Sequence, residues 1–340
     1  MNSNNISKIG VIGAGSWGTT LANLLAEKGL EVDLWVKEKE VLSQIRDEGE
    51  NKTFLPCVKL DSRLRPVETF EEALYNKQFL LMVVPSHAFR VVLTDMKPYI
   101  NREMLVMAAT KGIENKTLMT MSQIVEDVLS KDYLDNFLCL SGPSFAKEVC
   151  KKLPTAVTVA GSRMESAQRL QQVFHTEYFR VYVSRDLMGV QLGGALKNVI
   201  AIAAGVSDGL NFGHNARAAL ITRGLAEITR LGVAMGANPL TFAGLAGIGD
   251  LVLTCTGDLS RNRTVGLKIG RGLSVMDITS GMKMVAEGIK TARSVYELAV
   301  KMGVDMPIAT QVYQIIYEGK DPKVAVKELM ARELKEELEY

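Results

Sequence analysis

Short runs of consecutive apolar residues alternate with amphipathic stretches along the first half of the chain. Such runs are typical of strands buried on both faces of a parallel sheet. The stretches between them, including 40–47, 88–96 and 121–130, have the apolar spacing of helices. The alternation predicts a doubly wound, parallel α/β sheet with binding loops at the carboxyl ends of its strands. The predicted strands are Ile9–Ile12, Val32–Val36, Phe79–Val84, Met104–Ala109, Phe137–Leu140, Thr155–Ala160 and Tyr178–Val183.

Strand-like runs nearly vanish after Arg185, and helical periodicity takes over. A chain of 340 residues also exceeds the usual size of a single core. We therefore expect two domains, residues 1–185 with the sheet and residues 186–340 all-helical. Because no proline- or serine-rich linker separates them, the two should pack closely and share a cleft. The predicted helices of the second domain are Leu187–Val206, Asn215–Gly236, Glu287–Met302 and Ile308–Tyr317.

A glycine-spaced turn follows the first predicted strand and opens into a helical stretch. Gly13 permits a tight turn, Gly15 lets the backbone approach a pyrophosphate, and Gly18 lets the helix pack closely on the strand. The free N–H groups and dipole of the helix N-terminus favour phosphate. In this strand–turn–helix context, with a second strand at Glu31–Val36, the spacing predicts a dinucleotide-binding site.

Composition narrows the class of protein. Hydrophobic residues make up 47% and charged residues 23%, with a formal net charge of +2. This balance gives no general case for binding nucleic acid or an anionic membrane. The four cysteines form no paired motif, the N-terminus has no secretory pattern, and the apolar run Val199–Val206 is too short to span a bilayer. These features predict reduced thiols and a cytoplasmic location.

The candidate proton donor is a lysine. The three histidines, His87, His175 and His214, form no catalytic triad and no metal-ligand spacing, so no metal site is expected. Lys197 lies in a long uncharged, glycine-containing helix, where a charge is costly unless it serves a site or reaches solvent. Lys111 follows a predicted strand at the ligand-binding edge. Burial and a neighbouring cation can lower a lysine pKa toward neutrality.

Three further segments have the chemistry of oxyanion or phosphate sites. Ser144 is placed as the N-cap of a helix that follows a strand end. Asp250 and Thr254 share one helical face at i,i+4. The segment Ser260-Arg-Asn-Arg263 opens another helix with guanidinium and amide groups. Each could be an ordinary surface feature, but together with a dinucleotide fold they indicate a substrate site.

Several long phrases of the chain resemble the NAD(P)-dependent glycerol-3-phosphate dehydrogenases of bacteria. The similarity extends to about Lys320. It implies a Rossmann-type domain followed by a helical substrate domain, assembled as a homodimer, and hydride transfer between NAD(P)H and dihydroxyacetone phosphate, giving sn-glycerol 3-phosphate for phospholipid synthesis. The matching phrases are Gly13-Ala-Gly-Ser-Trp-Gly-Thr19, Val83-Val-Pro-Ser-His87, Thr110-Lys-Gly112, Ser141-Gly-Pro-Ser-Phe-Ala-Lys-Glu148, Gly189-Val-Gln-Leu-Gly-Gly-Ala-Leu-Lys-Asn-Val-Ile-Ala201, Leu245-Ala-Gly-Ile-Gly-Asp-Leu251 and Ser260-Arg-Asn-Arg263.

The resemblance also implies roles for individual residues. Lys197 would exchange the proton at the C2 oxygen, and Lys111 would hold that oxygen region. Asp250 and Thr254 would orient the substrate and Lys197. The remaining substrate contacts would be Gly142, Ser144, Asn198, Ser260, Arg261 and Asn262. The cofactor contacts would be Gly13, Gly15, Ser16, Trp17, Gly18, Lys37, Lys111, Ala146, Arg261, Val285 and Glu287.

The choice between NADH and NADPH depends on the end of the second strand. An acidic residue there favours NADH and a basic one NADPH. The strand ends with Lys37, which could meet a 2′-phosphate, whereas Asp33 has the sequence spacing for ribose recognition but lies inside the strand. We expect NADPH to be favoured and NADH tolerated.

Two alternatives remain. A 3-hydroxyacid or 6-phosphogluconate-type dehydrogenase has a similar architecture, but places several residues between the lysine and asparagine of its first long helix. Here Lys197 and Asn198 are adjacent. A non-catalytic dinucleotide sensor would need no proton donor, so the presence of Lys111, Lys197, Asp250 and Arg261 argues against it.

Overall fold

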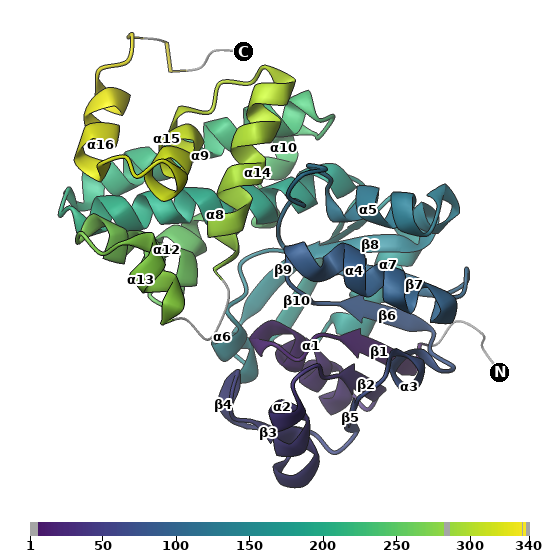
Figure 1. The fold of residues 1–340 in the computed structure, drawn as a ribbon. Helices are drawn as coiled ribbons and strands as arrows, with labels where there is room; N and C mark the ends of the chain where they lie inside the picture. Colours follow the sequence, from purple (N-terminus) through teal and green to yellow (C-terminus); the bar gives the residue numbers. More distant parts are fainter. Residues whose placement is uncertain (1–5, 282–285, 335, 338–340) are drawn as a thin grey trace.

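The computed structural model describes residues 6–281, 286–334 and 336–337, which form two halves (Figure 1). A twisted sheet flanked by helices makes up the first half, and a bundle of helices makes up the second. Strand β10 ends at Ser184 and helix α8 begins at Leu187, so the chain passes directly from the sheet to the bundle.

The sheet has the strand order of a doubly wound dinucleotide-binding fold. The order is β10-β9-β8-β7-β6-β1-β2-β5, so strand sequence reverses between β1 and β6. Each strand that the apolar runs predicted is present. The strands are β1 (Lys8–Ile12), β2 (Glu31–Trp35), β5 (Leu64–Val67), β6 (Phe79–Met82), β7 (Leu105–Ala108), β8 (Phe137–Ser141), β9 (Thr155–Gly161) and β10 (Phe179–Ser184); β3 (Glu50–Asn51) and β4 (Leu55–Lys59) form a separate hairpin.

The expectation of a wholly parallel sheet is wrong at one edge. Strand β9 runs antiparallel to β8, and β10 runs parallel to β9. The connection between β8 and β9 contains only the five-residue helix α6 (Ala146–Cys150). A parallel return is usually made through a full crossover helix, which this connection lacks, and here the chain turns back instead.

Helices cover both faces of the sheet (Figure 1). One apolar core lies between the strands and α1, α2 and α7, and a second lies under α3, α4 and α5. Alternate side chains of the strands supply both cores, which explains why the strands are apolar throughout. These helices are α1 (Ser16–Glu27), α2 (Lys39–Ser43), α3 (Phe70–Leu74), α4 (Ser86–Met96), α5 (Met121–Val128) and α7 (Met164–Phe174).

Helix α8 (Leu187–Gly209) runs through the centre of the second half. It is longer than the apolar run read from the sequence, and it is long and apolar enough to cross a bilayer. However, 83% of its most apolar window is buried among the other helices. The surrounding helices are α9 (Gly213–Ala234), α10 (Pro239–Phe242), α11 (Asp250–Thr256), α12 (Arg261–Gly270), α13 (Val275–Ser280), α14 (Glu287–Met302), α15 (Pro307–Tyr317) and α16 (Pro322–Met330), with a π-turn at Leu245–Gly249.

Candidate active site

In the glycine turn between β1 and α1, two of the glycines have no room for a side chain, and the third faces open space. Gly13 has φ +113°, and a Cβ there would lie 2.9 Å from the Val83 carbonyl oxygen. A Cβ on Gly18 would lie 1.9 Å from the Gly13 oxygen. By contrast, a Cβ on Gly15 would meet nothing within 4 Å, and Gly15 is the N-cap of α1 without a side-chain cap. This open backbone at the β1/β6 switch point fits the pyrophosphate of a dinucleotide.

The residues around this turn fit the remainder of a dinucleotide. Ser16 and Trp17 are the first residues of α1, and the buried Trp17 Nε1 has no hydrogen-bond partner. Lys37 is exposed just beyond the carboxyl end of β2. Asp33, in contrast, is buried in mid-strand, with its carboxylate held by Arg65 at 2.8 Å and Lys77 at 2.5 Å. Asp33 therefore stabilises the sheet and is not available to a ribose.

Asp250 links both candidate lysines. The Nζ of Lys111 donates to Asp250 Oδ2 at 2.6 Å, and the Nζ of Lys197 donates to Oδ1 of the same carboxylate. Lys197 also donates to Thr254 Oγ1 at 2.8 Å, a contact of the kind that the family resemblance implied. Asp250 is 1% exposed and Lys197 is 7% exposed. The cluster thus places two cations around one buried anion, and every charge has a partner.

This environment changes the pKa of Lys197. Burial lowers the pKa of Lys197 to about 8, although Asp250 opposes the shift, and the charge of Lys111 lowers the pKa further. The pKa of Asp250 is lowered despite its burial because both lysines stabilise the carboxylate. A group with a pKa near 8 can donate and accept a proton at neutral pH.

Glycines allow α8 to place Lys197 in this position. A Cβ on Gly193 would lie 2.3 Å from the Ala246 oxygen, and a Cβ on Gly194 would lie 2.5 Å from Ser141 Oγ. The helix therefore packs closely between the π-turn and the end of β8. Lys197, one turn further along, reaches the N-terminal turn of α11.

The turn after β8 contributes a carbonyl to the same cluster. The Gly142 oxygen accepts hydrogen bonds from Lys111 Nζ at 3.1 Å and from Ser144 Oγ at 3.0 Å. The prediction that Ser144 is a helix N-cap is wrong: α6 begins at Ala146, and its N-cap is Phe145 without a side-chain bond. The hydroxyl of Ser144 donates to the Gly142 carbonyl instead.

A second polar group surrounds the N-terminus of α12. Ser260 is the N-cap and accepts a hydrogen bond from the Arg263 N–H at 3.2 Å. Asn262 donates to Asn198 Oδ1 at 2.9 Å and accepts from the Gly288 N–H at 3.0 Å, so both asparagines are tied into the packing. Among the described residues, the Arg261 guanidinium makes no hydrogen bond or ion pair with another side chain. It is the cation left available to an anion here.

Glu287 joins the two halves of the molecule. As the first residue of α14, it accepts a hydrogen bond of 2.6 Å from Ser86 Oγ at the start of α4. Burial raises the pKa of Glu287, and the Ser86 hydrogen bond opposes that change. The other residue predicted on this segment, Val285, lies outside the described residues.

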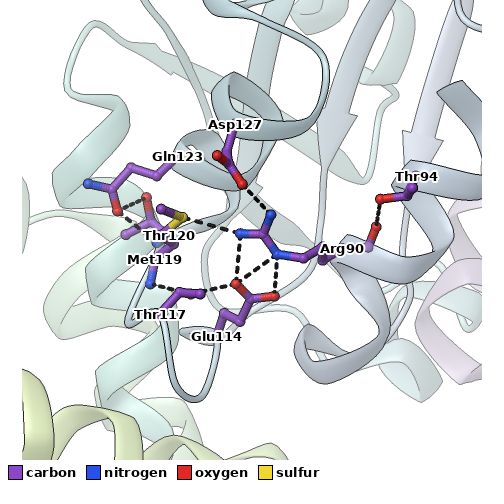
Figure 2. A network of polar contacts seen from close by, with 8 residues as sticks. All are labelled: Arg90, Thr94, Glu114, Thr117, Met119, Thr120, Gln123 and Asp127. Atoms are coloured by element: carbon purple, nitrogen blue, oxygen red, sulfur yellow. Dashed lines mark hydrogen bonds and ion pairs between the residues drawn. The ribbon is translucent and has the colours of Figure 1, made fainter.

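Sequence reasoning did not identify Ser86, Arg90 and Glu114. Arg90 and Glu114 form an ion-paired network beside the Lys111 segment (Figure 2). His87 lies in the first turn of α4. Partial desolvation of its ring lowers its pKa, and the charges of Lys290 and Lys37 lower it further. The partners in these contacts are far apart in the sequence, so no local pattern indicates them.

A dinucleotide-binding sheet whose ligand edge faces a buried lysine on a second, helical half is the arrangement of a two-domain nicotinamide-dependent dehydrogenase. Family models place the chain within this class. Residues 8–167 match the N-terminal model of NAD-dependent glycerol-3-phosphate dehydrogenase, and residues 186–327 match its C-terminal model. The chain belongs to this family.

Individual relatives agree. The chain is 59% identical over 331 residues to glycerol-3-phosphate dehydrogenase (NAD(P)+) of Syntrophobacter fumaroxidans, covering 97% of each chain. It is 52% identical over 328 residues to the Myxococcus xanthus enzyme of the same name, covering 96% of this chain and 98% of that one. The crystal structure of the Coxiella burnetii glycerol-3-phosphate dehydrogenase superposes with a TM-score of 0.92 at 40% identity, covering 96% and 99% of the two chains.

Proposed function

We propose that this protein catalyses reversible hydride transfer between NAD(P)H and dihydroxyacetone phosphate, giving sn-glycerol 3-phosphate. The observation that carries the proposal is the Lys197–Asp250–Lys111 cluster at the ligand edge of a dinucleotide-binding sheet. The balanced reaction consumes one ketone, one hydride and one proton, and the cluster contains a group able to provide the proton.

Lys197 donates that proton to the C2 oxygen, and it removes the proton in the reverse direction. Asp250 and Thr254 hold the Nζ of Lys197 in one orientation. Lys111 stabilises the negative charge that develops on the same oxygen. A bound NAD(P)H would supply the hydride, and the turn at Gly13, Gly15 and Gly18, with Ser16 and Trp17, would hold its pyrophosphate.

The substrate phosphate binds at the N-terminus of α12. Among the described residues, the Arg261 guanidinium makes no hydrogen bond or ion pair and interacts electrostatically with Glu287. A guanidinium suits bidentate binding of phosphate. Ser260 and Asn262 flank it, and Asn198 lies on the α8 side. Gly142 and Ser144 border the substrate from the sheet side, while Ala146 and Glu287 border the cofactor.

NADPH is the favoured cofactor in this proposal. Lys37 is exposed beyond the end of β2, where a 2′-phosphate would lie, and the nearby His87 experiences the charges of both Lys37 and Lys290. Asp33, the acidic alternative for NADH, is occupied by its ion pairs. NADH should still be accepted, because one lysine provides a point contact without a planar fork.

The wider role proposed is the supply of sn-glycerol 3-phosphate for phospholipid synthesis by a homodimer in the cytoplasm. The size, balanced charge and buried core helix support a protein that works in water. Sedimentation equilibrium of the purified chain tests the dimer.

Turnover of dihydroxyacetone phosphate with NADPH, and in parallel with NADH, tests the proposed activity. We expect oxidation of either cofactor, with the larger kcat/KM for NADPH. Reduction of the keto acid that corresponds to a 3-hydroxyacid, without reduction of dihydroxyacetone phosphate, would favour the 3-hydroxyacid dehydrogenase class. Cofactor binding without turnover of either substrate would identify a sensor.

A further inference from the structure

Lys111 lies on an irregular segment, residues 110–119, which we call the strap. The strap connects β7 to α5 and contains no helix or strand. Loops between strand and helix in such sheets usually have about 2–6 residues. A segment of this length that carries a functional lysine needs additional contacts to keep that lysine in one place.

The helical half provides some of these contacts. A Cβ on Gly112 would lie 2.5 Å from Ser86 Oγ and 3.3 Å from Glu287 Oε2, so the strap passes directly against that pair. Ile113 is 2% exposed and belongs to the core of the helical half. Its carbonyl accepts a hydrogen bond from Ser294 Oγ at 3.2 Å.

The sheet half holds the strap through Arg90 of α4 (Figure 2). Arg90 Nε lies 2.9 Å and 3.0 Å from the two carboxylate oxygens of Glu114, and its Nη2 lies 2.9 Å from Oε2. Nη1 binds Asp127 of α5, and Nη2 also contacts Met119 Sδ at 3.2 Å. Arg90 therefore joins α4, the strap and α5 in one network.

The backbone of the strap is strained beside this network. Lys116 and Leu118 have φ values of +75° and +61°, which are uncommon for residues with a Cβ. The turn that contains them is closed by hydrogen bonds from Glu114 N to Met119 O at 2.9 Å and from Leu118 N to Glu114 O at 3.1 Å. Strained backbone of this kind persists only where the surroundings determine it.

We propose that Arg90 is a positioning residue for Lys111: by binding Glu114, it holds the strap so that the Lys111 ammonium stays on Asp250. Only two residues separate Lys111 from Glu114, so movement of Glu114 displaces the lysine. This inference rests on the proposed function, in which Lys111 and Lys197 serve the reaction. Arg90 itself contacts neither lysine and takes no part in the chemistry.

A displaced Lys111 changes the titration of Lys197. The titratable groups that face Lys197 are Lys111 on the strap and Asp250 and Cys255 on α11. Lys111 lowers the pKa of Lys197, so its withdrawal raises that pKa. Reduction of the ketone requires protonated Lys197, and its alkaline limit should therefore move to higher pH.

The test compares Arg90→Met, Arg90→Lys and Glu114→Gln with a matched control, Arg65→Met. Arg65 also binds one carboxylate through two nitrogens, that of Asp33, but it lies on β5 away from the strap. We expect Arg90→Met to lower kcat about 10- to 100-fold, as small misplacements of reacting groups do, and to move the alkaline limit upward. Arg90→Lys should recover part of both effects, and Arg65→Met should show neither.

A double variant separates positioning from a direct effect of the Arg90 charge. In a Lys111→Ala background, Arg90→Met should change neither kcat nor the pH profile further, because its effect passes through Lys111. An undiminished effect in that background would overturn the proposal. The proposal would also be overturned if Arg90→Met lost as much stability as Arg65→Met but kept the wild-type alkaline limit of the reduction reaction.

Hydrogen–deuterium exchange provides a measurement without turnover. In the protein without cofactor or substrate, amides of residues 110–119 should exchange faster in Arg90→Met than in wild type or Arg65→Met. Unchanged exchange would overturn the proposal that Arg90 holds the strap. If the strap exchanges faster in Arg90→Met but the wild-type protein has no activity, the proposed function is refuted while the role of Arg90 in holding the strap stands.

Discussion

At the scale of single residues, the site is a balance of buried charges. A lone lysine inside an apolar helix would lose its hydration at a large cost in free energy. Lys197 avoids much of that cost because Asp250 accepts its hydrogen bond, and Lys111 shares the same carboxylate. The remaining desolvation is what lowers the pKa of Lys197 to about 8. The burial that costs free energy is therefore also what brings the pKa of Lys197 close to neutral pH.

Replacing Lys197 should remove the proton donor and little else. We expect Lys197→Met to bind NADPH normally and to lose about 10²–10⁴-fold in kcat, the usual contribution of a general acid. Lys77→Met is the matched control, because Lys77 is also a buried lysine on a carboxylate, that of Asp33, far from the site. Steady-state kinetics and cofactor titration measure both. A Lys197→Met variant with near-normal kcat would exclude this lysine from the proton transfer.

The lowered pKa of Lys197 predicts opposite pH profiles for the two directions. Reduction needs the protonated amine, so its kcat/KM should fall as pH rises through about 8. The kcat/KM for oxidation of sn-glycerol 3-phosphate, which needs the neutral amine, should rise over the same interval. Profiles of kcat/KM in both directions check this, with Lys197→Met as the reference. If both directions respond to pH in the same sense, or if the reduction rate falls only near the ordinary pKa of lysine, Lys197 is not the group that transfers the proton.

Arg261 should act on the phosphate and not on the chemistry. Because the guanidinium makes no hydrogen bond or ion pair among the described residues, Arg261→Ala breaks no such contact, although it removes the electrostatic interaction with Glu287. We expect kcat/KM to fall much further for dihydroxyacetone phosphate than for dihydroxyacetone, since phosphate binding energy orients the distant ketone. Arg261→Lys should restore part of the loss. Equal losses for the two substrates would assign Arg261 to the cofactor or the fold.

At the scale of elements, close packing of α8 and α12 organises the substrate side of the site. A Cβ on Gly205 would lie 2.1 Å from the Arg263 oxygen, and a Cβ on Gly266 would lie 2.0 Å from the Ile202 oxygen. The two helices therefore touch backbone to backbone. This contact brings Asn198 and Asn262 within hydrogen-bond distance and places the N-terminus of α12 beside α8.

Gly205→Ala tests this contact. Alanine is the better helix former by about 1 kcal/mol, so an open position would gain stability. Here the added methyl should push α12 away, and the free energy of unfolding should fall by about 1–3 kcal/mol, as for other overpacked sites. Gly281→Ala is the control, since among the described residues the nearest atom to an added Cβ would be 3.9 Å away. Urea unfolding measures both, and a stabilised Gly205→Ala would show that the helices are not in close contact.

The elements that sequence predicts are those with strong local patterns. The predicted strands and the long helices of the second half are all present because their apolar runs and periodicity are continuous. Strand β5 was missed because it is short and contains Pro66, which a central strand rarely tolerates. Its place at the sheet edge makes the proline acceptable.

In the candidate site, too, the residues that could be predicted were those with a local sequence pattern. Lys197, Asp250 and Thr254 could be proposed because one is an isolated charge and the others share a helical face. The hydroxyl of Ser144 could bond either to the helix or to a nearby carbonyl, and sequence does not decide between them. Ser86 and Arg90 were missed because their partners, Glu287 and Glu114, lie on other elements.

At the scale of the whole molecule, side chains from each half pack into the core of the other half. Ile113 leaves the sheet half and packs in the helical core, while Leu187 at the start of α8 packs against the core under α4 and α5. The hydrogen bond between Ser86 and Glu287 spans the same junction. Cores that share side chains gain stability from each other, so we expect wild type to unfold in one transition.

Ile113→Ala should break this coupling. The lost methyl groups cost about 2–5 kcal/mol as a cavity in the helical core, and the strap loses its anchor there. Both tryptophans, Trp17 and Trp35, lie in the sheet half, so fluorescence follows that half, whereas far-ultraviolet circular dichroism is dominated by the helices. In urea, the two signals should coincide for wild type and separate for Ile113→Ala, with the helical signal lost first. Ile228→Ala removes a fully buried isoleucine that lies wholly within the helical half and should keep the signals together. If both variants keep coincident transitions, Ile113 is an ordinary core residue and the halves are coupled through other contacts.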